Sequence, residues 1–265
     1  MTTHSNHQII WITGASSGIG LALARESAKR GASVVLSARS SDKLEEVRKT
    51  LPHAEKHLVL PLDLENQSNF NELVQQVVTH YGRIDILINN GGVSQRGEAW
   101  NTPMEVDRKI MEINYFGTIA LTKAVLPIMQ KQQFGHIVAI SSIAGKFGFY
   151  LRSAYSASKH ALQGFFESLL LEEAKNNIRV TLVFPGKINT PISTNALNEK
   201  GEAHGVMDHN QETGMSAEVC AAQILKAIDQ NKIEVLIGNK EVKAVTLKRF
   251  LPSLFWKIIR KQRAT

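Results

Sequence analysis

Short apolar runs alternate with longer amphipathic stretches along this chain, and the alternation limits the folds available to it. The apolar runs, most of them rich in β-branched residues, occupy residues 8–13, 33–37, 56–60, 84–89, 136–141, 179–184 and 234–237. Most lack strict two-residue alternation, as expected of strands buried on both faces. The amphipathic stretches predict helices over residues 18–30, 41–50, 66–81, 106–130, 154–176 and 216–230. The sequence therefore predicts an α/β fold, a doubly wound parallel sheet of about seven strands with helices on both faces.

Glycine residues follow three of the predicted helices. Gly31, Gly82 and Gly135 stand just beyond helical stretches, where a residue in the left-handed conformation commonly ends a helix. They support the predicted boundaries.

A single dinucleotide-binding catalytic domain is predicted for residues 1–265, because α/β domains often exceed 200 residues. Two segments depart from the regular pattern: 191–215, a polar stretch that we interpret as a substrate lid, and 240–265, a basic extension. Cys220 is the only cysteine, which excludes an internal disulfide and a cysteine-built metal site. Its Ala-rich surroundings indicate a small buried hydrophobe. We interpret His53 and His57 as surface histidines and predict no metal site.

The formal charge of +7 is concentrated at the C-terminal end. Residues 240–265 contain eight Lys and Arg residues and one Glu, so residues 1–239 are balanced. This distribution argues against a nucleic-acid-binding face spread over the domain. The polar first eight residues do not form a signal sequence, and no run reaches the roughly 18 apolar residues of a spanning helix. We therefore expect a cytoplasmic protein.

A glycine-rich motif links the first predicted strand to the first predicted helix. It reads Thr13-Gly14-Ala15-Ser16-Ser17-Gly18-Ile19-Gly20. Its glycines permit a tight turn and let a pyrophosphate approach the backbone, while the helix N-terminus offers unpaired N–H groups. The motif predicts a dinucleotide site, and the alternative is an ordinary glycine turn.

The end of the second predicted strand bears on the choice of dinucleotide. An acidic residue there would accept hydrogen bonds from the adenine ribose and favour NAD(H), and none is present. Arg39 instead offers a planar guanidinium suited to a 2′-phosphate, with Ser40 and Lys43 nearby. We predict NADP(H) rather than NAD(H), the alternative for Arg39 being a solvated loop residue.

Tyr155 and Lys159 lie four residues apart on a predicted helix, so both side chains project from one face. A free phenol has a pKa of about 10, and a neighbouring ammonium lowers it. Tyr155 is therefore a candidate acid/base that gives its proton to a carbonyl oxygen while hydride reaches the carbon. Ser142 would hold that oxygen by a hydrogen bond. Alone, a Tyr-x3-Lys pair also fits an ordinary surface helix.

Taken in order, these motifs resemble the classical short-chain dehydrogenase/reductase family, from Thr13 to about Thr190. The resemblance is carried by the glycine motif, Asp63, Asn89-Asn90-Gly91-Gly92, Asn114, Ser142, Tyr155, Lys159 and Pro185-Gly186. The family usually has alanine where this chain has Gly91. Ser142 precedes Tyr155 by 13 residues, the separation typical of the family, which favours Ser142 over Ser141.

The resemblance implies a Rossmann-type oxidoreductase acting on a CH–OH group and extends to hydroxysteroid-dehydrogenase-like members. It implies that Asn114, Ser142, Tyr155 and Lys159 are catalytic, with Lys159 on the nicotinamide ribose and Asn114 holding a water. With the glycine motif and Arg39, the expected cofactor contacts are Gly14, Ser16, Ser17, Gly18, Ile19, Gly20, Arg39, Ser40, Asp63, Leu64, Asn90, Gly91, Tyr155, Lys159, Pro185, Gly186, Ile188 and Thr190. It also implies a homodimer or homotetramer formed through the helices at 106–130 and 154–176.

Residues 250–261 mix aromatic, aliphatic and basic side chains, and Pro252 suits a helix start. Two interpretations stay open: an interfacial helix that contacts anionic lipid, and a terminal helix packed on the protein. Phe147, Phe149 and Tyr150 are expected to shape a pocket for an apolar carbonyl or alcohol substrate, whose identity the sequence does not give.

Three functions remain open. The first is an NADP(H)-dependent carbonyl reductase or alcohol dehydrogenase, favoured by the complete set of catalytic residues. The second is a cofactor-binding regulatory or scaffold protein with little turnover. The third is a dehydratase or epimerase, for whose larger substrate domain this chain has little room.

Overall fold

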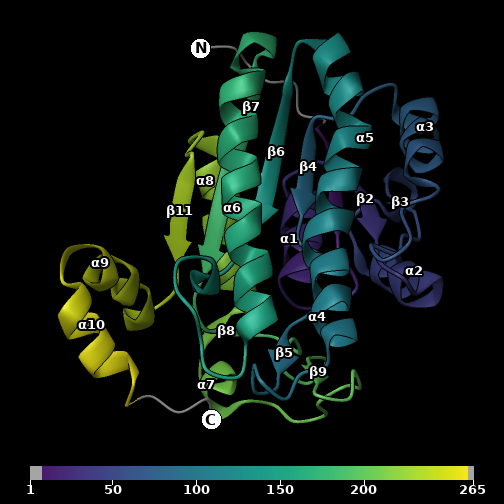
Figure 1. Ribbon diagram of the computed structural model, residues 1–265. Coiled ribbons are helices and arrows are strands. Elements are labelled where there is room, and N and C mark those ends of the chain that lie inside the picture. The colour runs from purple at the N-terminus through teal and green to yellow at the C-terminus, as the bar shows by residue number, and fades with distance from the viewer. Residues whose placement is uncertain (1–7, 262–265) are drawn as a thin grey trace.

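A computed structural model describes residues 8–261 (Figure 1), so the first seven residues and Arg263 of the basic extension lie outside it. The strands are β1 (Ile9–Thr13), β2 (Ser33–Ser37), β3 (Leu58–Val59), β4 (Ile86–Asn89), β5 (Gln95–Arg96), β6 (Gly135–Ile140), β7 (Ile178–Pro185), β8 (Ile188–Asn189), β9 (Leu197–Asn198), β10 (Met215–Ser216) and β11 (Glu234–Ile237). The α-helices are α1 (Gly18–Lys29), α2 (Ser41–Thr50), α3 (Phe70–Tyr81), α4 (Met104–Met111), α5 (Gly117–Gln132), α6 (Ser153–Glu173), α7 (His209–Glu212), α8 (Ala217–Asp229), α9 (Lys243–Phe250) and α10 (Pro252–Ile259). A π-helical turn, η2 (Glu112–Phe116), joins α4 to α5, and short 3₁₀ turns are η1 (Ala54–Lys56), η3 (Ile143–Gly145), η4 (Ala174–Asn176) and η5 (Lys240–Val242).

Seven strands form one parallel sheet in the order β11-β7-β6-β4-β1-β2-β3. The order reverses between β1 and β4: the chain first adds β2 and β3 on one side of β1, and then adds β4, β6, β7 and β11 on the other side. In open sheets of this kind, ligands bind at the carboxyl ends of the strands beside such a reversal. The predicted doubly wound Rossmann fold in a single domain is confirmed.

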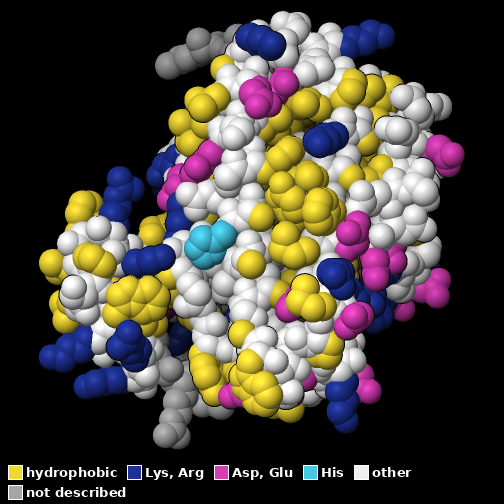
Figure 2. All heavy atoms as spheres, in the orientation of Figure 1, with side chains coloured by type: hydrophobic (Ala, Val, Ile, Leu, Met, Phe, Trp, Pro, Cys, Tyr) yellow, Lys and Arg dark blue, Asp and Glu magenta, His cyan; other side chains and the backbone are white. Residues whose placement is uncertain are grey.

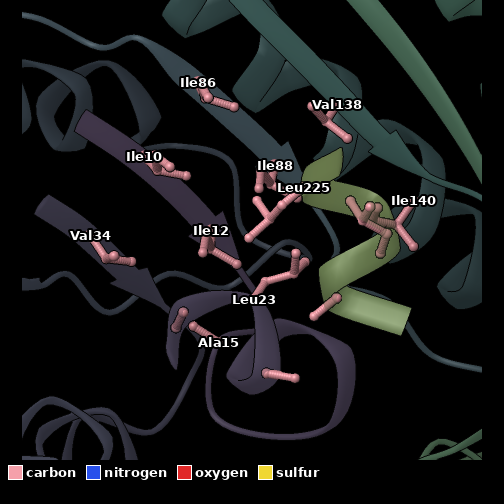
Figure 3. Packing of buried hydrophobic residues seen from close by; sticks show 14 of the residues in the cluster. Ile10, Ile12, Ala15, Leu23, Val34, Ile86, Ile88, Val138, Ile140 and Leu225 are labelled. Carbon is pink, nitrogen blue, oxygen red and sulfur yellow. The ribbon is translucent and has the colours of Figure 1, made fainter. Parts of the chain in front are cut away.

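Strand side chains alternate between two cores, one on each face of the sheet. Ile10 and Ile12 of β1 pack with α1 and α8 (Figure 3), whereas Ile9 and Trp11 pack with α3, α5 and α6. Because both faces are covered, these strands need no polar side, which explains their nearly continuous apolar sequences.

Several predicted helix boundaries were wrong. The helix expected from residue 66 begins at Phe70, because the Asn66 side chain accepts hydrogen bonds from the backbone N–H and hydroxyl of Ser68 and forms a local turn. The stretch 106–130 is three elements, α4, η2 and α5, and begins at Met104.

Two of the three glycines predicted to end helices do so: Gly31 has φ of +89° and Gly82 of +77°. The prediction for Gly135 is wrong, because Gln133 takes the left-handed conformation there and Gly135 begins β6. A Cβ at residue 135 would lie 2.4 Å from the Met129 sulfur, so close packing explains this glycine.

The assignment of His57 to the surface is also wrong. His57 is buried, its Nδ1 accepts a hydrogen bond from the Val34 N–H, and its Nε2 lies 2.9 Å from the Pro52 carbonyl oxygen. His57 therefore ties the loop after α2 to strand β2. Cys220 is buried as predicted.

The C-terminal helices α9 and α10 form a small lobe beside β11, seen in yellow in Figure 1. Pro252 occupies the start of α10, as predicted. The Phe255 side chain, only 1% exposed, packs against Ile143 and Phe147. One face of α10 is therefore docked on the domain. Within residues 8–261, no helix is both long and apolar enough to cross a bilayer.

Candidate active site

The glycine motif forms a tight turn between β1 and α1. Gly14 and Gly18 have φ of +67° and +53°, a region that other residues rarely adopt. At Gly20 a Cβ would lie 2.2 Å from the Gly14 carbonyl oxygen, so the turn leaves no room for a larger residue. Ser17, the N-cap residue of α1, makes no side-chain capping bond, which leaves helix N–H groups for an anion. These features fit the pyrophosphate of a dinucleotide.

The loop after β4 lies directly against this turn. The Asn90 side chain donates to the carbonyl oxygens of Thr13 and Gly14 at 2.9 and 3.4 Å. The N–H groups of Asn90 and Gly91 both donate to the Thr13 hydroxyl at 2.9 Å. A Cβ on Gly91 would lie 2.8 Å from the Leu64 Cδ1 atom, so the family's usual alanine would require the end of the Leu64 side chain to shift.

The residues predicted to contact the adenine half of the cofactor follow β2 and β3. Arg39 is exposed, and the Ser40 hydroxyl accepts a 3.4 Å hydrogen bond from the Lys43 N–H as the N-cap of α2. Asp63 is exposed, and its carboxylate accepts a bond from the Glu65 N–H. The guanidinium of Arg39 is thus accessible at the same edge as the glycine turn.

Ser142 and Tyr155 meet at the carboxyl end of β6. Ser142 is the N-cap of η3, its hydroxyl accepts a hydrogen bond from the Ala144 N–H at 3.1 Å, and it lines the same pocket as Tyr155. Ser141 points elsewhere, donating to the Lys159 carbonyl at 3.0 Å. The structure brings together the pair predicted from the 13-residue spacing.

Lys159 is buried beneath Tyr155 on the same helix. Its Nζ donates to the Ile140 carbonyl at 2.9 Å and lies 5.8 Å from the centre of the Tyr155 ring. Asn114 sits in the π-helical turn η2, where its amide donates to Val93 and to the Ser158 hydroxyl at 2.9 and 3.0 Å. π-Helical turns of this kind often occur at functional sites.

The pKa of Tyr155 is raised above its usual value because the phenol is fully desolvated by burial. The Ser142 side chain and the charges of Arg152 and Arg96 act in the opposite direction. Burial also lowers the pKa of Lys159 to about 8. The lowered tyrosine pKa expected from Lys159 is therefore wrong for this geometry: burial dominates, and the opposing cations are two arginines.

One pocket connects the glycine turn to the catalytic residues. Of the residues predicted to contact the cofactor, its lining includes Ile19, Asn90, Pro185, Gly186, Ile188 and Thr190. Its outer wall includes Phe149, Tyr150, Ile192, Gln211 and Ile259. The prediction for Phe147 is wrong, because that ring packs against Phe149 and Phe255 rather than lining the pocket. Ile192 and Gln211 come from the 191–215 segment, so this segment forms part of the pocket wall, and its role as a substrate lid stays a prediction.

Sequence reasoning missed residues that act through long-range contacts. The Gln95 side-chain oxygen accepts from the N–H groups of Ala154 and Tyr155 at 2.8 and 3.3 Å, which fixes the first turn of α6. Arg96 and Arg152 both pair with Asp208 of the 191–215 segment. No motif marks them, because these contacts join residues up to 112 apart. Among residues 8–261, no group of three or more His, Cys, Asp or Glu could hold a metal ion.

Comparison with known proteins identifies related sequences. A family model described as short chain dehydrogenase matches residues 8–201. The dehydrogenase/reductase SDR family protein 7-like of Anopheles gambiae is 47% identical over 98% of this chain and 84% of its own length. Dehydrogenase/reductase SDR family member 7B of Mus musculus is 40% identical over 95% of this chain and 80% of its own length.

Solved structures share the fold. A short-chain dehydrogenase from Streptomyces avermitilis superposes with a TM-score of 0.82 at 28% identity, covering 97% of this chain and 96% of that one. A Burkholderia phymatum protein in complex with NAD gives 0.85 at 23% identity, with 96% of each chain covered. An alcohol dehydrogenase from Thermococcus sibiricus, complexed with 5-hydroxy-NADP, gives 0.75 at 22% identity over 88% of this chain and 97% of that one.

Proposed function

This chain belongs to the short-chain dehydrogenase family, a family of oxidoreductases, and we propose that it is an NADP(H)-dependent carbonyl reductase or alcohol dehydrogenase. The observation that carries the proposal is the meeting of Ser142 and Tyr155 in a pocket continuous with the glycine turn. Lys159 and Asn114 complete the set beneath them.

When bound, NADP(H) supplies or accepts the hydride. The protein's own residues handle the proton: Tyr155 gives its phenolic proton to the substrate oxygen in reduction and takes it back in oxidation. Ser142, which lines the same pocket as the phenol, would hold the same oxygen as charge develops on it. The buried Lys159 ammonium anchors to the Ile140 carbonyl and would bind the nicotinamide ribose on its remaining N–H groups.

The decisive test is the substitution Tyr155→Phe, assayed by NADPH consumption over ketones, aldehydes and steroids. Loss of a general acid/base costs about 10²- to 10⁴-fold in rate, while NADPH binding is expected to persist. Equal turnover by wild type and variant would refute the mechanism.

The preference for NADP(H) is proposed from Arg39, which is exposed beside the glycine turn. The acidic residue that would favour NAD(H) at the end of this strand is absent. A guanidinium–phosphate bond contributes about 1.5–3 kcal/mol, so Arg39→Asp should lower kcat/KM for NADPH relative to NADH by about 10- to 100-fold. Lys49→Asp, the same charge change on the exposed side of α2, is the control. An unchanged ratio in Arg39→Asp contradicts the assignment.

The substrate is proposed to be a largely apolar carbonyl compound or alcohol, because Phe149, Ile192 and Ile259 line the outer pocket. The side-chain oxygen of Gln211, also in the wall, is buried and has no hydrogen-bond partner within the described chain. A hydroxyl donor on the substrate would satisfy it. In the same screen, Gln211→Leu should raise KM for hydroxyl-bearing ketones and leave KM for simple ketones unchanged; equal effects on both would exclude this contact.

The second candidate, a regulatory or scaffold protein with little turnover, is supported by the same glycine turn and needs only cofactor binding. It predicts tight NADPH binding with no substrate turned over by wild type. Screening and fluorescence titration on one preparation separate the two functions.

We also propose a homo-oligomer formed through α5 and α6. Figure 2 shows hydrophobic side chains gathered between these helices, and Phe116 next to α5 is 45% exposed. Phe116→Glu should lower the mass found by analytical ultracentrifugation, whereas Trp100→Glu, on an 83% exposed ring elsewhere, should not. A monomeric wild type would contradict the proposal.

A cytoplasmic protein that touches membrane peripherally is proposed from the α9–α10 lobe. Its outer side displays Phe250, Leu254 and Trp256 at 70%, 45% and 45% exposure beside basic residues (Figure 2). Such a surface suits anionic lipid. Flotation on phosphatidylserine vesicles should fall in the double variant Phe250→Asp/Trp256→Asp and persist in the control Trp100→Asp. Equal flotation of wild type and both variants would exclude the α9–α10 lobe as the lipid-binding surface.

A further inference from the structure

Two arginines share one carboxylate beside the catalytic tyrosine. Arg152 Nη2 lies 2.8 Å from Asp208 Oδ2, and Arg96 pairs with both oxygens of that carboxylate. The side chains of Arg152, Arg96 and Asp208 are 16%, 4% and 8% exposed, respectively. The group is therefore almost dry, and it holds two positive charges against one negative charge.

The three residues come from different parts of the chain. Arg96 ends β5, Arg152 is the N-cap of α6, and Asp208 precedes α7 in the 191–215 segment. Backbone pairing ties the first two regions together, since the Gly97 N–H donates to the Leu151 carbonyl at 3.2 Å. Asp208 is fixed in turn by its N–H, which donates to the Ser193 hydroxyl at 3.3 Å. The cluster fastens the segment over the pocket.

Tyr155 lies in the first turn of α6, three residues after Arg152, and both residues line the same pocket. Charges interact more strongly beside a buried group than they do in bulk water. The surplus guanidinium charge therefore favours negative charge on the Tyr155 oxygen and on a substrate oxygen bound to it. Arg152 and Arg96 both lower the pKa of Tyr155 against the effect of burial.

We propose that Arg152, backed by Arg96, is an electrostatic positioning residue for Tyr155, and that Asp208 sets how much of their charge reaches the phenol. This inference rests on the proposed oxidoreductase function and deepens it. The 191–215 segment would then affect the acid/base step, because it supplies the Asp208 carboxylate. Other charged or titratable groups in this pocket are Lys159, Lys187 and Tyr150, and Asp208 is the acidic residue in its lining.

The test compares the pH dependence of kcat/KM for NADP+-dependent oxidation of one alcohol, the reduction product of the carbonyl compound that turns over fastest in the screen. This rate rises with pH as the catalytic base deprotonates. Arg152→Gln should move the rise to higher pH, because a cation near the phenol is lost. Asp208→Asn should move it to lower pH, because both guanidinium charges then act unopposed. Arg152→Lys keeps the charge and should restore the wild-type profile.

Opposite shifts separate an electrostatic role from a structural one, which would lower the rate at every pH without moving the profile. Arg48→Gln, which removes an arginine paired with Glu45 on α2, is the surface control and should leave the profile in place. If Asp208→Asn does not fold, the comparison of Arg152→Gln with Arg152→Lys decides alone. Overlapping profiles for these two variants would overturn the inference.

A second readout does not depend on turnover. Ultraviolet difference titration of wild type against Tyr155→Phe follows ionisation of this phenol directly, and the same difference in the Arg152→Gln background should appear at higher pH. Failure of the proposed function is distinguishable: in that case either wild type turns over no substrate or Tyr155→Phe keeps full activity. If Tyr155→Phe is inactive and neither titration nor profile moves in Arg152→Gln, only the present inference falls.

Discussion

Replacing Gly20 with alanine tests whether the glycine turn depends on close approach of its own backbone. The new Cβ would lie 2.2 Å from the Gly14 carbonyl oxygen and 2.6 Å from the Asn90 amide nitrogen. Neither distance is tolerable, and the nearer atom belongs to the backbone, so the turn itself must shift. Overpacking of this kind costs about 1–3 kcal/mol.

Two measurements follow from this strain. At about 2–4 °C per kcal/mol for a domain of this size, the melting temperature should fall by about 2–12 °C. Because the Gly14 carbonyl and the start of α1 are displaced, NADPH affinity measured by fluorescence titration should fall at least about tenfold, equivalent to about 1.4 kcal/mol.

Gly148→Ala is the matched control. No atom lies within 4 Å of a Cβ built at Gly148, so its stability should stay within about 0.5 kcal/mol of wild type. NADPH affinity should also be unchanged. If Gly20→Ala behaves like Gly148→Ala in both assays, the close approach does not shape the site and the reasoning is refuted.

Three further predictions concern stability. Phe255→Ala removes the buried ring that docks α10, so urea denaturation should show a loss of about 3–5 kcal/mol, whereas Trp256→Ala on the exposed side should lose much less. His136 is buried against the Thr181 hydroxyl, and desolvation lowers its pKa to about 4. Because the unfolded state binds the proton first, wild type should lose on the order of 3 kcal/mol as pH falls from about 6.5 to 4. That loss should be absent in His136→Asn, and an equal loss in both proteins would contradict the assignment. Asp85 is buried and accepts from the Ile9 N–H at 2.8 Å and from Arg83. In urea denaturation, Asp85→Asn should lower the free energy of unfolding by about 1–3 kcal/mol. A loss smaller than that caused by Arg83→Gln would argue against a stabilising role for the buried bond between the Ile9 N–H and Asp85.

Much of the fold was predictable because its signals are local. The runs at 33–37 and 234–237 and the helix at 41–50 match their elements at both ends. Each depends on neighbouring residues: β-branched apolar runs, amphipathic spacing, and an N-cap at Ser40. Predictions were wrong where a packing contact, rather than the local sequence, selects the residue. At residue 135, for example, glycine is required by the close approach of the Met129 side chain and not by the end of a helix.

The sequence by itself determined which segments form strands and helices, where the glycine turn lies, and which residues are the catalytic candidates Ser142, Tyr155 and Lys159. These features follow from residue type and from spacing along the chain. Only the tertiary structure decided the electrostatics of the site. Lys159 faces the Ile140 carbonyl, burial raises the pKa of Tyr155, and the opposing charges come from Arg152 and Arg96. Desolvation and charge pairing depend on what surrounds a group in space, and Asp208 reaches the site from 56 residues beyond Arg152. No spacing along the chain records such an approach.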